Sequence, residues 1–473
     1  MSSSSRPTRP VCFRTKWEGS GLDASVAVSG ISNIGAAANR ENQDAFFTYC
    51  NPMNSALVVG LFDGHGRDTG RDVAEAAKRY FEAQFQGYSR EDYARLESDP
   101  DEFFRELFAS CHQALKYMLC DLYERAGHVV EEHQPDGFLV RHNWHTGVVA
   151  SVRGGTTATI VVVLNGGRKI YSSNVGDSAA AIFSMRPAMR VNDLNVRGDD
   201  GADVLRLNEQ LTEDYSNNPT PRSDLLVLSG NHSPESATEF SRARLTHCSS
   251  LDATLPALRF VYDSMEPKSR RLPIFSMTTD GELHRNPRGD YYKNVRNEWA
   301  TVVATPFTSM FPDALAFTRS LGDFHMHSYG VSCNPTVTEL SLERVMTRHL
   351  GLTSHLQDNQ SGNQRSNASD NDEDSTSLAS PASSSGPREH TFVLLVASDG
   401  VWDNWTFRDL HSFLCTANRD KSLQQKSECP GDHAPADAMV SALLDANLQR
   451  ANGYFGDNAD NMTAVLCNFT FRN

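Results

Sequence analysis

The 473-residue chain contains no apolar run long enough to cross a bilayer, and its first residues lack the apolar core of a signal peptide. Ser2 stands where N-myristoylation would need a glycine. Positive charge is also scarce, since 44 Lys and Arg oppose 59 Asp and Glu for a net charge of −15. This balance argues against nucleic acid or an anionic membrane as the main partner. We therefore expect an intracellular protein of the cytoplasm or nucleus.

Paired cysteines are missing too. The nine cysteines are scattered, include no CxxC pair and are odd in number, which favours reduced thiols over a disulfide framework. No internal repeat is evident. With 39% hydrophobic residues, the chain is able to bury a substantial core. These absences leave an ordinary globular protein, whose chemistry must be read from its motifs.

Two stretches have the composition of disordered chain. Residues 1–22 are rich in Ser, Pro and charge and predict a disordered N-terminal tail. Residues 353–390 are rich in Ser, Asn, Gln and Asp, and this acidic composition buries too little apolar surface to offset the entropy of ordering. Strand-like sequence resumes at 391, so we expect a disordered loop inside a single domain that covers 23–473.

The remaining sequence has alternating helix and strand signals. Apolar residues recur at helical spacing, and the long apolar stripe of the second segment is typical of core packing; the predicted helices cover 68–85, 101–126 and 434–451. Short, nearly continuous apolar runs predict buried strands over 57–62, 157–164, 169–175 and 463–471. The chain is thus expected to be rich in both element types.

Acidic residues sit at the borders of several apolar runs. Asp63 follows the run 57–62, Asp177 follows 170–175, Asp399 follows 392–398, and Asp460 precedes the last run. With Asp44, these acids suggest strand ends that converge on one point. Clustered carboxylates have one common stable use, which is to hold hard divalent cations.

The chemistry of such a cluster can be stated from the residues alone. Mg²⁺ and Mn²⁺ prefer carboxylate, carbonyl and water oxygens, and two such ions about 3.5–4 Å apart activate a shared water. His65 lies two residues after Asp63, so its imidazole must be near any metal that Asp63 binds. Its ordinary pKa of about 6.5 suits proton donation to a leaving oxygen.

Each motif alone has a less specific interpretation. Asp-Gly after a strand is more often a turn than a ligand, and we interpret Asp280-Gly281 as a turn because it has no partner motif. A lone histidine in a loop is usually structural or solvated. Only the whole set, in order, favours a metal-dependent enzyme.

In order, the set resembles the signature of the metal-dependent protein phosphatases of type 2C, the PPM family. The resemblance is carried by Glu41-Asn42-Gln43-Asp44, Asp63-Gly64-His65-Gly66, Gly155-Thr156-Thr157-Ala158, Asn174-Val175-Gly176-Asp177-Ser178, Thr318-Arg319-Ser320-Leu321-Gly322-Asp323, Ser398-Asp399-Gly400-Val401-Trp402-Asp403 and Asp460-Asn461-Met462-Thr463. It runs from about residue 24 to 471. Three segments lie outside it and are interpreted as insertions, at about 127–152, 213–312 and 353–390.

The resemblance implies an α+β fold, in which a central β-sandwich of two antiparallel sheets is flanked by helices on both sides in four layers. It also implies roles for individual residues. The implied metal ligands of a two-ion core site are Asp44, Asp63, Asp399, Asp460 and the Gly64 carbonyl. Asp177 and Asp403 match a weaker third ion site, formed with Asp399. His65 matches the general acid, and Thr156, Asp323 and Asn461 look like supporting residues behind the ligands.

The implied reaction is hydrolysis of phosphoserine and phosphothreonine in proteins, with Mg²⁺ or Mn²⁺ as cofactor. A hydroxide that bridges the two ions attacks phosphorus in line, and His65 protonates the departing oxygen. The expected partners are phosphorylated proteins, and a monomer is expected. The alternatives are a pseudophosphatase that uses the fold as a binding module, and a phosphohydrolase that acts on a small molecule.

The chain departs from the family pattern at several positions. Gln43 replaces a common Glu, and Arg67 and Ala179 replace a common Gly and Arg. Arg40 is a candidate clamp for the substrate phosphate, since a guanidinium fits phosphate oxygens well, but its spacing to Asp44 is one residue shorter than usual. The 213–312 segment replaces a short segment of the family, which predicts a different choice of substrate.

Overall fold

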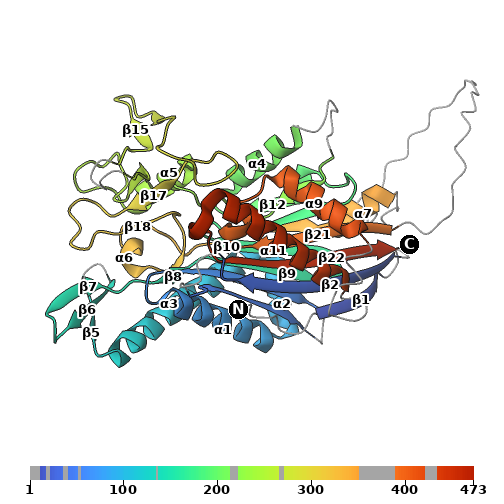
Figure 1. Cartoon of the computed structure of the whole chain (residues 1–473), viewed down its shortest axis with the longest axis horizontal. Coiled ribbons are helices and arrows are strands. Elements are labelled where there is room, and N and C mark those ends of the chain that lie inside the picture. Colours follow the sequence, from blue (N-terminus) through green and yellow to red (C-terminus); the bar gives the residue numbers. More distant parts are fainter. Residues whose placement is uncertain are drawn as a thin grey trace, which may run out of the picture.

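A computed structural model of the chain describes residues 11–17, 22–35, 41–51, 55–134, 137–213, 222–265, 271–350, 389–420 and 434–472. Two antiparallel sheets form the centre of the molecule (Figure 1). The six-stranded sheet has the order β1 (Val11–Trp17), β2 (Leu22–Asn33), β22 (Met462–Arg472), β21 (Glu389–Ala397), β11 (Ala179–Ser184) and β13 (Leu225–Val227). The eight-stranded sheet has the order β12 (Leu194–Arg197), β20 (Thr336–Ser341), β10 (Lys169–Val175), β9 (Ala158–Leu164), β4 (Leu57–His65), β8 (Gly155–Thr156) and β19 (Leu321–Gly322), with β3 (Asp44–Cys50) paired to β4.

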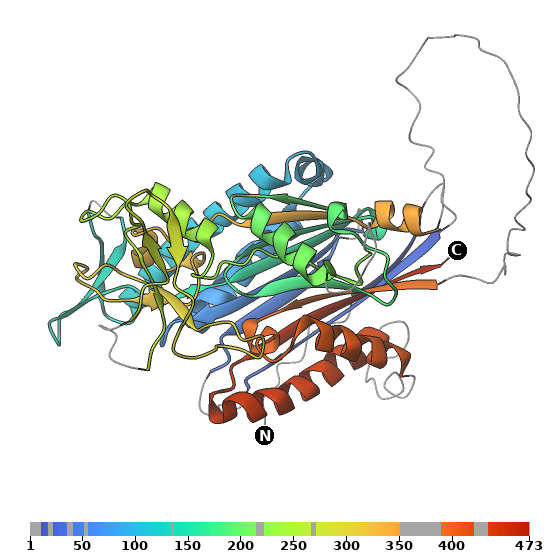
Figure 2. The same cartoon turned by 90° about the horizontal axis from the view of Figure 1, so that it is seen from above.

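Helices cover the outer face of each sheet, so the molecule has four layers (Figure 2). One outer layer, at the top of Figure 2, contains α1 (Gly70–Gly87), α2 (Arg90–Ser98) and α3 (Pro100–Arg125). The other, at the bottom, contains α9 (Phe407–Arg419) and α11 (Ala434–Phe455). The predicted α+β fold with a four-layer sandwich is therefore confirmed.

The central strands are continuously apolar because both of their faces are buried. In β4, Val58 and Phe62 belong to the core under α1 and α3, whereas Leu57, Val59 and Leu61 belong to the core between the sheets. Side chains alternate between the faces of a strand, so a strand between two cores needs an apolar residue at every position. β21 follows the same rule, with alternate residues in the inter-sheet core and in the core under α9 and α11.

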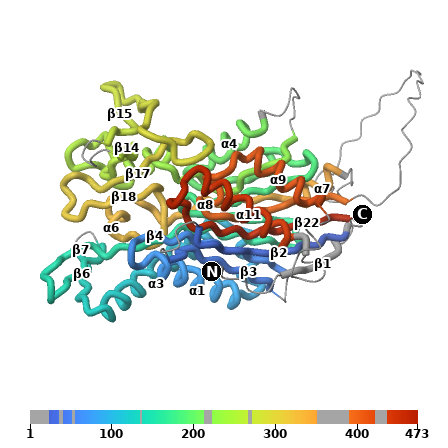
Figure 3. Tube along the Cα trace, in the orientation of Figure 1, coloured from blue at the N-terminus to red at the C-terminus, as the bar shows by residue number. Residues whose placement is uncertain are grey.

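Two smaller sheets and a hairpin gather at one end of the sandwich (Figures 1 and 3). The sheets are β5 (Val129–Glu132), β6 (Leu139–Asn143) and β7 (Val148–Ser151), and then β14 (Arg259–Tyr262), β17 (Thr301–Ala304) and β18 (Ala314–Leu315). The hairpin joins β15 (Phe275–Met277) and β16 (Leu283–Arg285). The second sheet shares a separate apolar cluster with α5 (Ala237–Thr246). Figure 3 shows these elements at the end of the sandwich near β4 and α8 (Asp399–Trp402), the short helix that follows β21.

The remaining short elements connect these layers. They are the helices α4 (Gly201–Glu213), α6 (Phe324–His327) and α7 (Leu342–Leu350), and the 3₁₀ turns η1 (Asn165–Gly167), η2 (Val191–Asp193) and η4 (Gly456–Asn458). Among the described residues, no helix is both long and apolar enough to span a membrane. The cysteines whose side chains are described are all free.

One predicted boundary needs correction. The range 1–22 was predicted to be disordered throughout, but β1 lies within it and pairs with β2 along its whole length, from Val11–Val28 to Trp17–Leu22. Backbone hydrogen bonding to β2 orders these residues as an edge strand, although the composition around them is polar. Within the range 213–312, predicted as an insertion, β13 pairs with β11 at the other edge of the six-stranded sheet. The disordered loop was predicted at 353–390. Residues 353–388 of this range lie outside the described residues, and the last two belong to β21.

Candidate active site

The end of β4 places the first two acidic motifs side by side. Asp44, which begins β3, lies directly opposite Asp63 in the antiparallel register of β3 and β4. The backbone of Asp63 is fixed by Thr157, whose Oγ1 accepts from Asp63 N at 3.1 Å and whose N–H donates to Asp63 O at 2.9 Å. Thr156 Oγ1 donates to the same carbonyl at 3.1 Å. The Gly155–Thr157 motif therefore holds the Asp63 turn in place.

The six-stranded sheet brings the other two acidic motifs to the same point. Ser398, between β21 and α8, donates from its hydroxyl to Asp44 Oδ2 at 2.9 Å and accepts from Thr463 N at 3.0 Å. Because β21 and β22 are neighbours, Asp399 after one strand meets Asp460 before the other. Ser398 thus ties Asp44 in one sheet to the Asp399 turn in the other.

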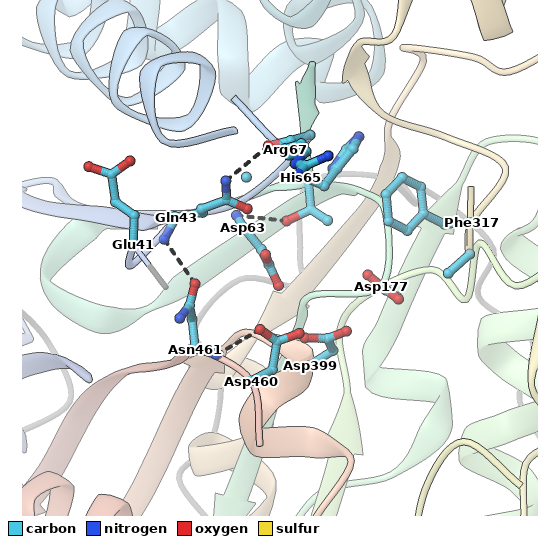
Figure 4. A pocket seen from close by; sticks show the side chains of 14 residues that line it. Glu41, Gln43, Asp63, His65, Arg67, Asp177, Phe317, Asp399, Asp460 and Asn461 are labelled. Carbon is cyan, nitrogen blue, oxygen red and sulfur yellow. Dashed lines mark hydrogen bonds between the residues drawn. The ribbon is translucent and has the colours of Figure 1, made fainter. Parts of the chain in front are cut away.

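Asn461 links the Asp460 turn to the loop before β3. Its Oδ1 accepts from Gln43 N at 2.8 Å, its Nδ2 donates to Ile34 O at 2.9 Å, and its own N–H donates to Asp460 Oδ1 at 2.8 Å. The Gln43 amide in turn donates to Gly66 O at 3.0 Å (Figure 4). Gln43 is therefore a bridge between the two loops, a role that its amide fills without a carboxylate.

These turns surround a cleft of about 840 Å³. Figure 4 shows Asp399 and Asp460 side by side at its base, with Asp63 and Asp177 directed toward them. The lining residues are Glu41, Gln43, Asp63, Gly64, His65, Gly66, Arg67, Thr157, Asp177, Ala316, Phe317, Asp399, Asp460 and Asn461. The structure thus brings together most of the residues that the motifs single out, from elements spread over almost the whole chain.

Two glycines are required for the turns to approach one another. A Cβ on Gly64 would lie 2.2 Å from the carbonyl oxygen of Gly70, and a Cβ on Gly400 would lie 1.8 Å from the carbonyl oxygen of Asn461. Both clashes are with backbone, which has no room to move. Glycine after Asp63 and after Asp399 is therefore a packing requirement of the converging strands.

The buried carboxylates of the cleft repel one another. Burial raises the pKa of Asp63 well above its usual range, and Asp44, Asp399, Asp460 and Asp177 raise it further. Burial, followed by Asp177, raises the pKa of Asp399 in the same way. Burial also raises the pKa of Asp44 to about 6, although hydrogen bonds from Thr463 and Ser398 oppose the shift.

This donor set fits a divalent cation. The oxygens Asp44 Oδ1 and Asp399 Oδ1 are buried and accept no hydrogen bond within the described part of the chain. Each is a hard anionic ligand with a free lone pair, and a cation would relieve both the repulsion and the unsatisfied oxygens. Among the described residues, no three acidic, His or Cys side chains are yet drawn together around one point. The fit is thus one of ligand chemistry and charge.

His65 is held at the rim of the cleft by Asp323. Its Nε2 lies 2.7 Å from Asp323 Oδ2, and Ser320 Oγ donates to the same oxygen at 2.7 Å. β8 makes this contact possible, because it pairs with β4 on one side and β19 on the other. Burial alone would lower the pKa of His65, but the Asp323 carboxylate raises it above its ordinary value. The Phe317 ring packs edge-on against the imidazole, with centroids 5.1 Å apart.

The residues predicted for the third ion differ in their contacts. Asp177 lines the cleft, but Asp403 does not, and its carboxylate contacts the 213–312 segment instead. The candidate phosphate clamp Arg40 lies outside the described residues, whereas Arg67 is exposed at the cleft. Asp280 lies in an exposed turn closed by Gly281 N to Thr278 O at 3.0 Å, as predicted.

Several site residues were missed in the sequence. Ser398 and Thr463 lie close in sequence to the predicted ligands, but nothing in their residue type predicts that their hydroxyl groups support those ligands. Phe317 lies just before the Thr318–Asp323 motif. His232 is buried, and its Nδ1 accepts from Gly176 N at 3.0 Å, next to Asp177. A histidine 56 positions from its partner is not identifiable without the fold.

No protein-family model matches the chain, and no curated protein is similar to it in sequence. Solved structures do match. A sex-determining protein of C. elegans is 14% identical with a TM-score of 0.45, over 96% of this chain and 65% of that one. The serine-threonine phosphatase 2C of Toxoplasma gondii is 13% identical with a TM-score of 0.46, over 98% and 99%. A serine/threonine phosphatase of S. agalactiae is 12% identical with a TM-score of 0.41, over 93% and 98%.

Proposed function

We propose that the chain is a metal-dependent protein serine/threonine phosphatase of the type 2C family, which acts as an intracellular monomer on phosphorylated proteins. One observation carries the proposal. Asp63, Asp399 and Asp460, from three separate strand ends, crowd one cleft beside a histidine that is already oriented by a carboxylate. At these identities and TM-scores the solved structures add no weight, so the proposal rests on the residues of the cleft.

Asp44, Asp63, Asp399, Asp460 and the Gly64 carbonyl would hold two Mg²⁺ or Mn²⁺ ions. When bound, the ions would supply positive charge for the phosphoryl oxygens and lower the pKa of a water that attacks phosphorus. The rest is done by the chain itself. The β4, β21 and β22 ends fix the carboxylates, and the cleft volume of about 840 Å³ admits a phosphorylated side chain.

His65 is the proposed proton donor to the departing Ser or Thr oxygen. It lines the cleft two residues from Asp63, and Asp323 at 2.7 Å both orients the imidazole and favours its protonated form. Phe317 packs on the ring and limits its rotation. No covalent intermediate on the protein is proposed, because the nucleophile would be a water activated by the bound ions.

The test is phosphate release from a phosphothreonine peptide. We expect release with Mn²⁺ or Mg²⁺ and none in excess EDTA. Asp399→Asn is expected to reduce turnover by orders of magnitude, because it removes a charged ligand at the base of the cleft. Asp280→Asn is the matched control, since it alters an Asp-Gly of the same local sequence in an exposed turn.

Each contrary result has a distinct meaning. Undiminished turnover in EDTA would contradict the two-ion mechanism. Peptide binding without phosphate release, at every divalent ion tested, would instead favour the pseudophosphatase. Faster hydrolysis of small phosphate esters than of any phosphopeptide would favour a small-molecule phosphohydrolase.

A further inference from the structure

Asp403 is covered by a segment that lies outside the type 2C resemblance. Residues 291–299 cross the end of α8, and three of their groups contact Asp403. Asn294 Nδ2 donates to Asp403 Oδ1 at 3.2 Å, Arg296 Nη2 lies 3.5 Å from the same oxygen, and Val295 N donates to the Asp403 carbonyl at 3.1 Å. Both the side chain and the backbone of Asp403 are thus engaged.

Arg296 is fixed in this position by further contacts. Its Nε donates to Glu298 Oε1 at 2.9 Å and its Nη2 to Glu298 Oε2 at 3.2 Å, which is a bidentate pairing. Its Nη1 also donates to the carbonyls of Trp402 and Trp405. The Arg296 side chain is 18% exposed. A guanidinium with this many hydrogen-bond partners is held in one orientation by the fold.

Lys293 adds a second positive charge at the same place. Its ammonium pairs with Glu298 at 3.9 Å, and Tyr292, next to it, stacks on Trp299 with ring centroids 4.0 Å apart. Burial alone would lower the pKa of Lys293, but Asp403, followed by Asp177 and Glu298, raises it to about 12. Lys293 thus belongs to the same cluster of charges, through Glu298, which also pairs with Arg296.

We propose that Arg296, with Lys293 beside it on Glu298, is the resident counterion of Asp403 and occupies the place of the third divalent ion, so that this chain binds two ions only. This inference rests on the proposed function. A divalent cation beside Asp403 would meet the Arg296 guanidinium at 3.5 Å from the carboxylate and the Lys293 ammonium behind it, and its Coulomb attraction to Asp403 would be offset by repulsion from these two cations. The carboxylate oxygen Oδ1 is also already engaged by Asn294 and Arg296.

The arrangement also attaches the 213–312 segment to the catalytic loop. Asp399 begins α8 and Asp403 follows its last residue, so the contacts of Arg296 with the Trp402 and Trp405 carbonyls fix the turn that presents Asp399. At the position of an exchangeable ion, this chain has side chains of its own 291–299 segment, which do not dissociate from the protein. Its ion content should therefore not rise above two as the concentration of divalent ion rises.

Equilibrium dialysis of the purified full chain against Mn²⁺, with protein-bound ion counted directly, tests the proposal. We expect two ions per wild-type chain at saturation, and still two in Asp403→Asn. The double variant with Lys293→Gln and Arg296→Gln is expected to take up a third, weaker ion. Arg285→Gln is the matched control, because Arg285 pairs with Glu235 in the same segment but away from the cleft. Thermal melting of each variant confirms that it is folded.

Three ions in the wild-type chain, with loss of one in Asp403→Asn, would overturn the inference and leave the proposed function intact. Two ions in both the wild type and the folded double variant would also overturn it, because removal of both cations would then have opened no ion site. No bound Mn²⁺ in any of the proteins would overturn the proposed function itself.

Discussion

At the scale of single residues, His65 is the group whose proposed role is most easily isolated. A general acid matters in proportion to how poorly the leaving group departs by itself. His65→Asn is therefore expected to slow hydrolysis of a phosphothreonine peptide by about 10²–10⁴-fold. Hydrolysis of p-nitrophenyl phosphate should slow far less, since nitrophenolate needs no proton to leave.

The comparison is made on kcat for the two substrates, with His145→Asn as the control, because His145 is exposed on the turn between β6 and β7. Equal losses on the two substrates would assign His65 to binding or to positioning of Asp63 instead. Asp323→Asn should follow the same pattern with a smaller loss, since Asp323 acts through the imidazole at 2.7 Å.

Residue identity and order were enough to predict the acids of the cleft, because each stands directly beside an apolar run. Asp403 shows where that reasoning fails. It stands in the same motif as Asp399, yet its partners are Asn294, Val295 and Arg296, over 100 positions away. A carboxylate that binds a metal ion and one that pairs with an arginine can have the same local sequence. Only the fold shows that Arg296 lies beside Asp403.

At the scale of elements, α5 carries a buried charge that holds the Thr318–Asp323 motif. Glu239 is fully buried, and its Oε1 accepts from Arg319 Nε at 3.1 Å. Arg319 also lies 3.4 Å from Asp200, whose carboxylate approaches the His232 imidazole at 3.4 Å. The network thus extends from the 213–312 segment to the Gly176–Asp177 turn.

Removal of one charge from this network should be costly. Glu239→Gln leaves the Arg319 guanidinium without its main buried counterion, and we expect a loss of about 3–5 kcal/mol in the free energy of unfolding. Urea denaturation measures it. Glu75→Gln is the control, since its pair with Lys78 is partly exposed and worth about 0–1 kcal/mol. A loss below 1 kcal/mol for Glu239→Gln would show that the network is not rigid in solution.

The same network predicts a response to acid. Burial would raise the pKa of both acids, but Arg319 holds the pKa of Glu239 well below its usual range, and His232 and Arg319 lower that of Asp200 to about 2. Depressed pKa values in the folded state give stability that is present above the ordinary pKa of about 4 and is lost as the pH falls toward 2. The difference in unfolding free energy between the wild type and Glu239→Gln should therefore shrink between about pH 5 and about pH 2. A difference that stays constant over this window would contradict the depressed pKa of Glu239.

The 213–312 segment was predicted only as an insertion, since its short apolar patches and many Pro, Asn and Ser residues give weak signals for helix or strand. The structure gives it an apolar cluster and several contacts with the motif residues, among them those of His232, Glu239 and Arg296. Such polar contacts between distant positions leave no periodic pattern. The long apolar strands, in contrast, were predictable because burial on both faces constrains every residue.

At the scale of the whole molecule, the two sheets of the sandwich meet at the cleft, because strand ends from both sheets line it. β4 and β21 lie in different sheets, and the acidic turns at their ends are connected by the hydrogen bond from Ser398 to Asp44 and by the bond from Gln43 to Asn461. Buried like charges destabilise a fold in the absence of a counterion. The candidate active site is thus a point of electrostatic repulsion in the sandwich, which opposes stability and which a bound cation would relieve.

This view predicts opposite effects of one substitution on stability and on activity. Asp63→Asn should raise the melting temperature of the EDTA-treated protein, because it removes the carboxylate that four other acids repel. It should also abolish turnover and most of the stabilisation by Mn²⁺. In the wild type that stabilisation is expected to reach about 2.7 kcal/mol when free Mn²⁺ is about 100 times its Kd. Differential scanning calorimetry with EDTA and with Mn²⁺ measures both effects, and Asp280→Asn should match the wild type in each. A lower melting temperature for metal-free Asp63→Asn would mean that hydrogen bonding by Asp63 outweighs its repulsion, and that the cleft is not strained.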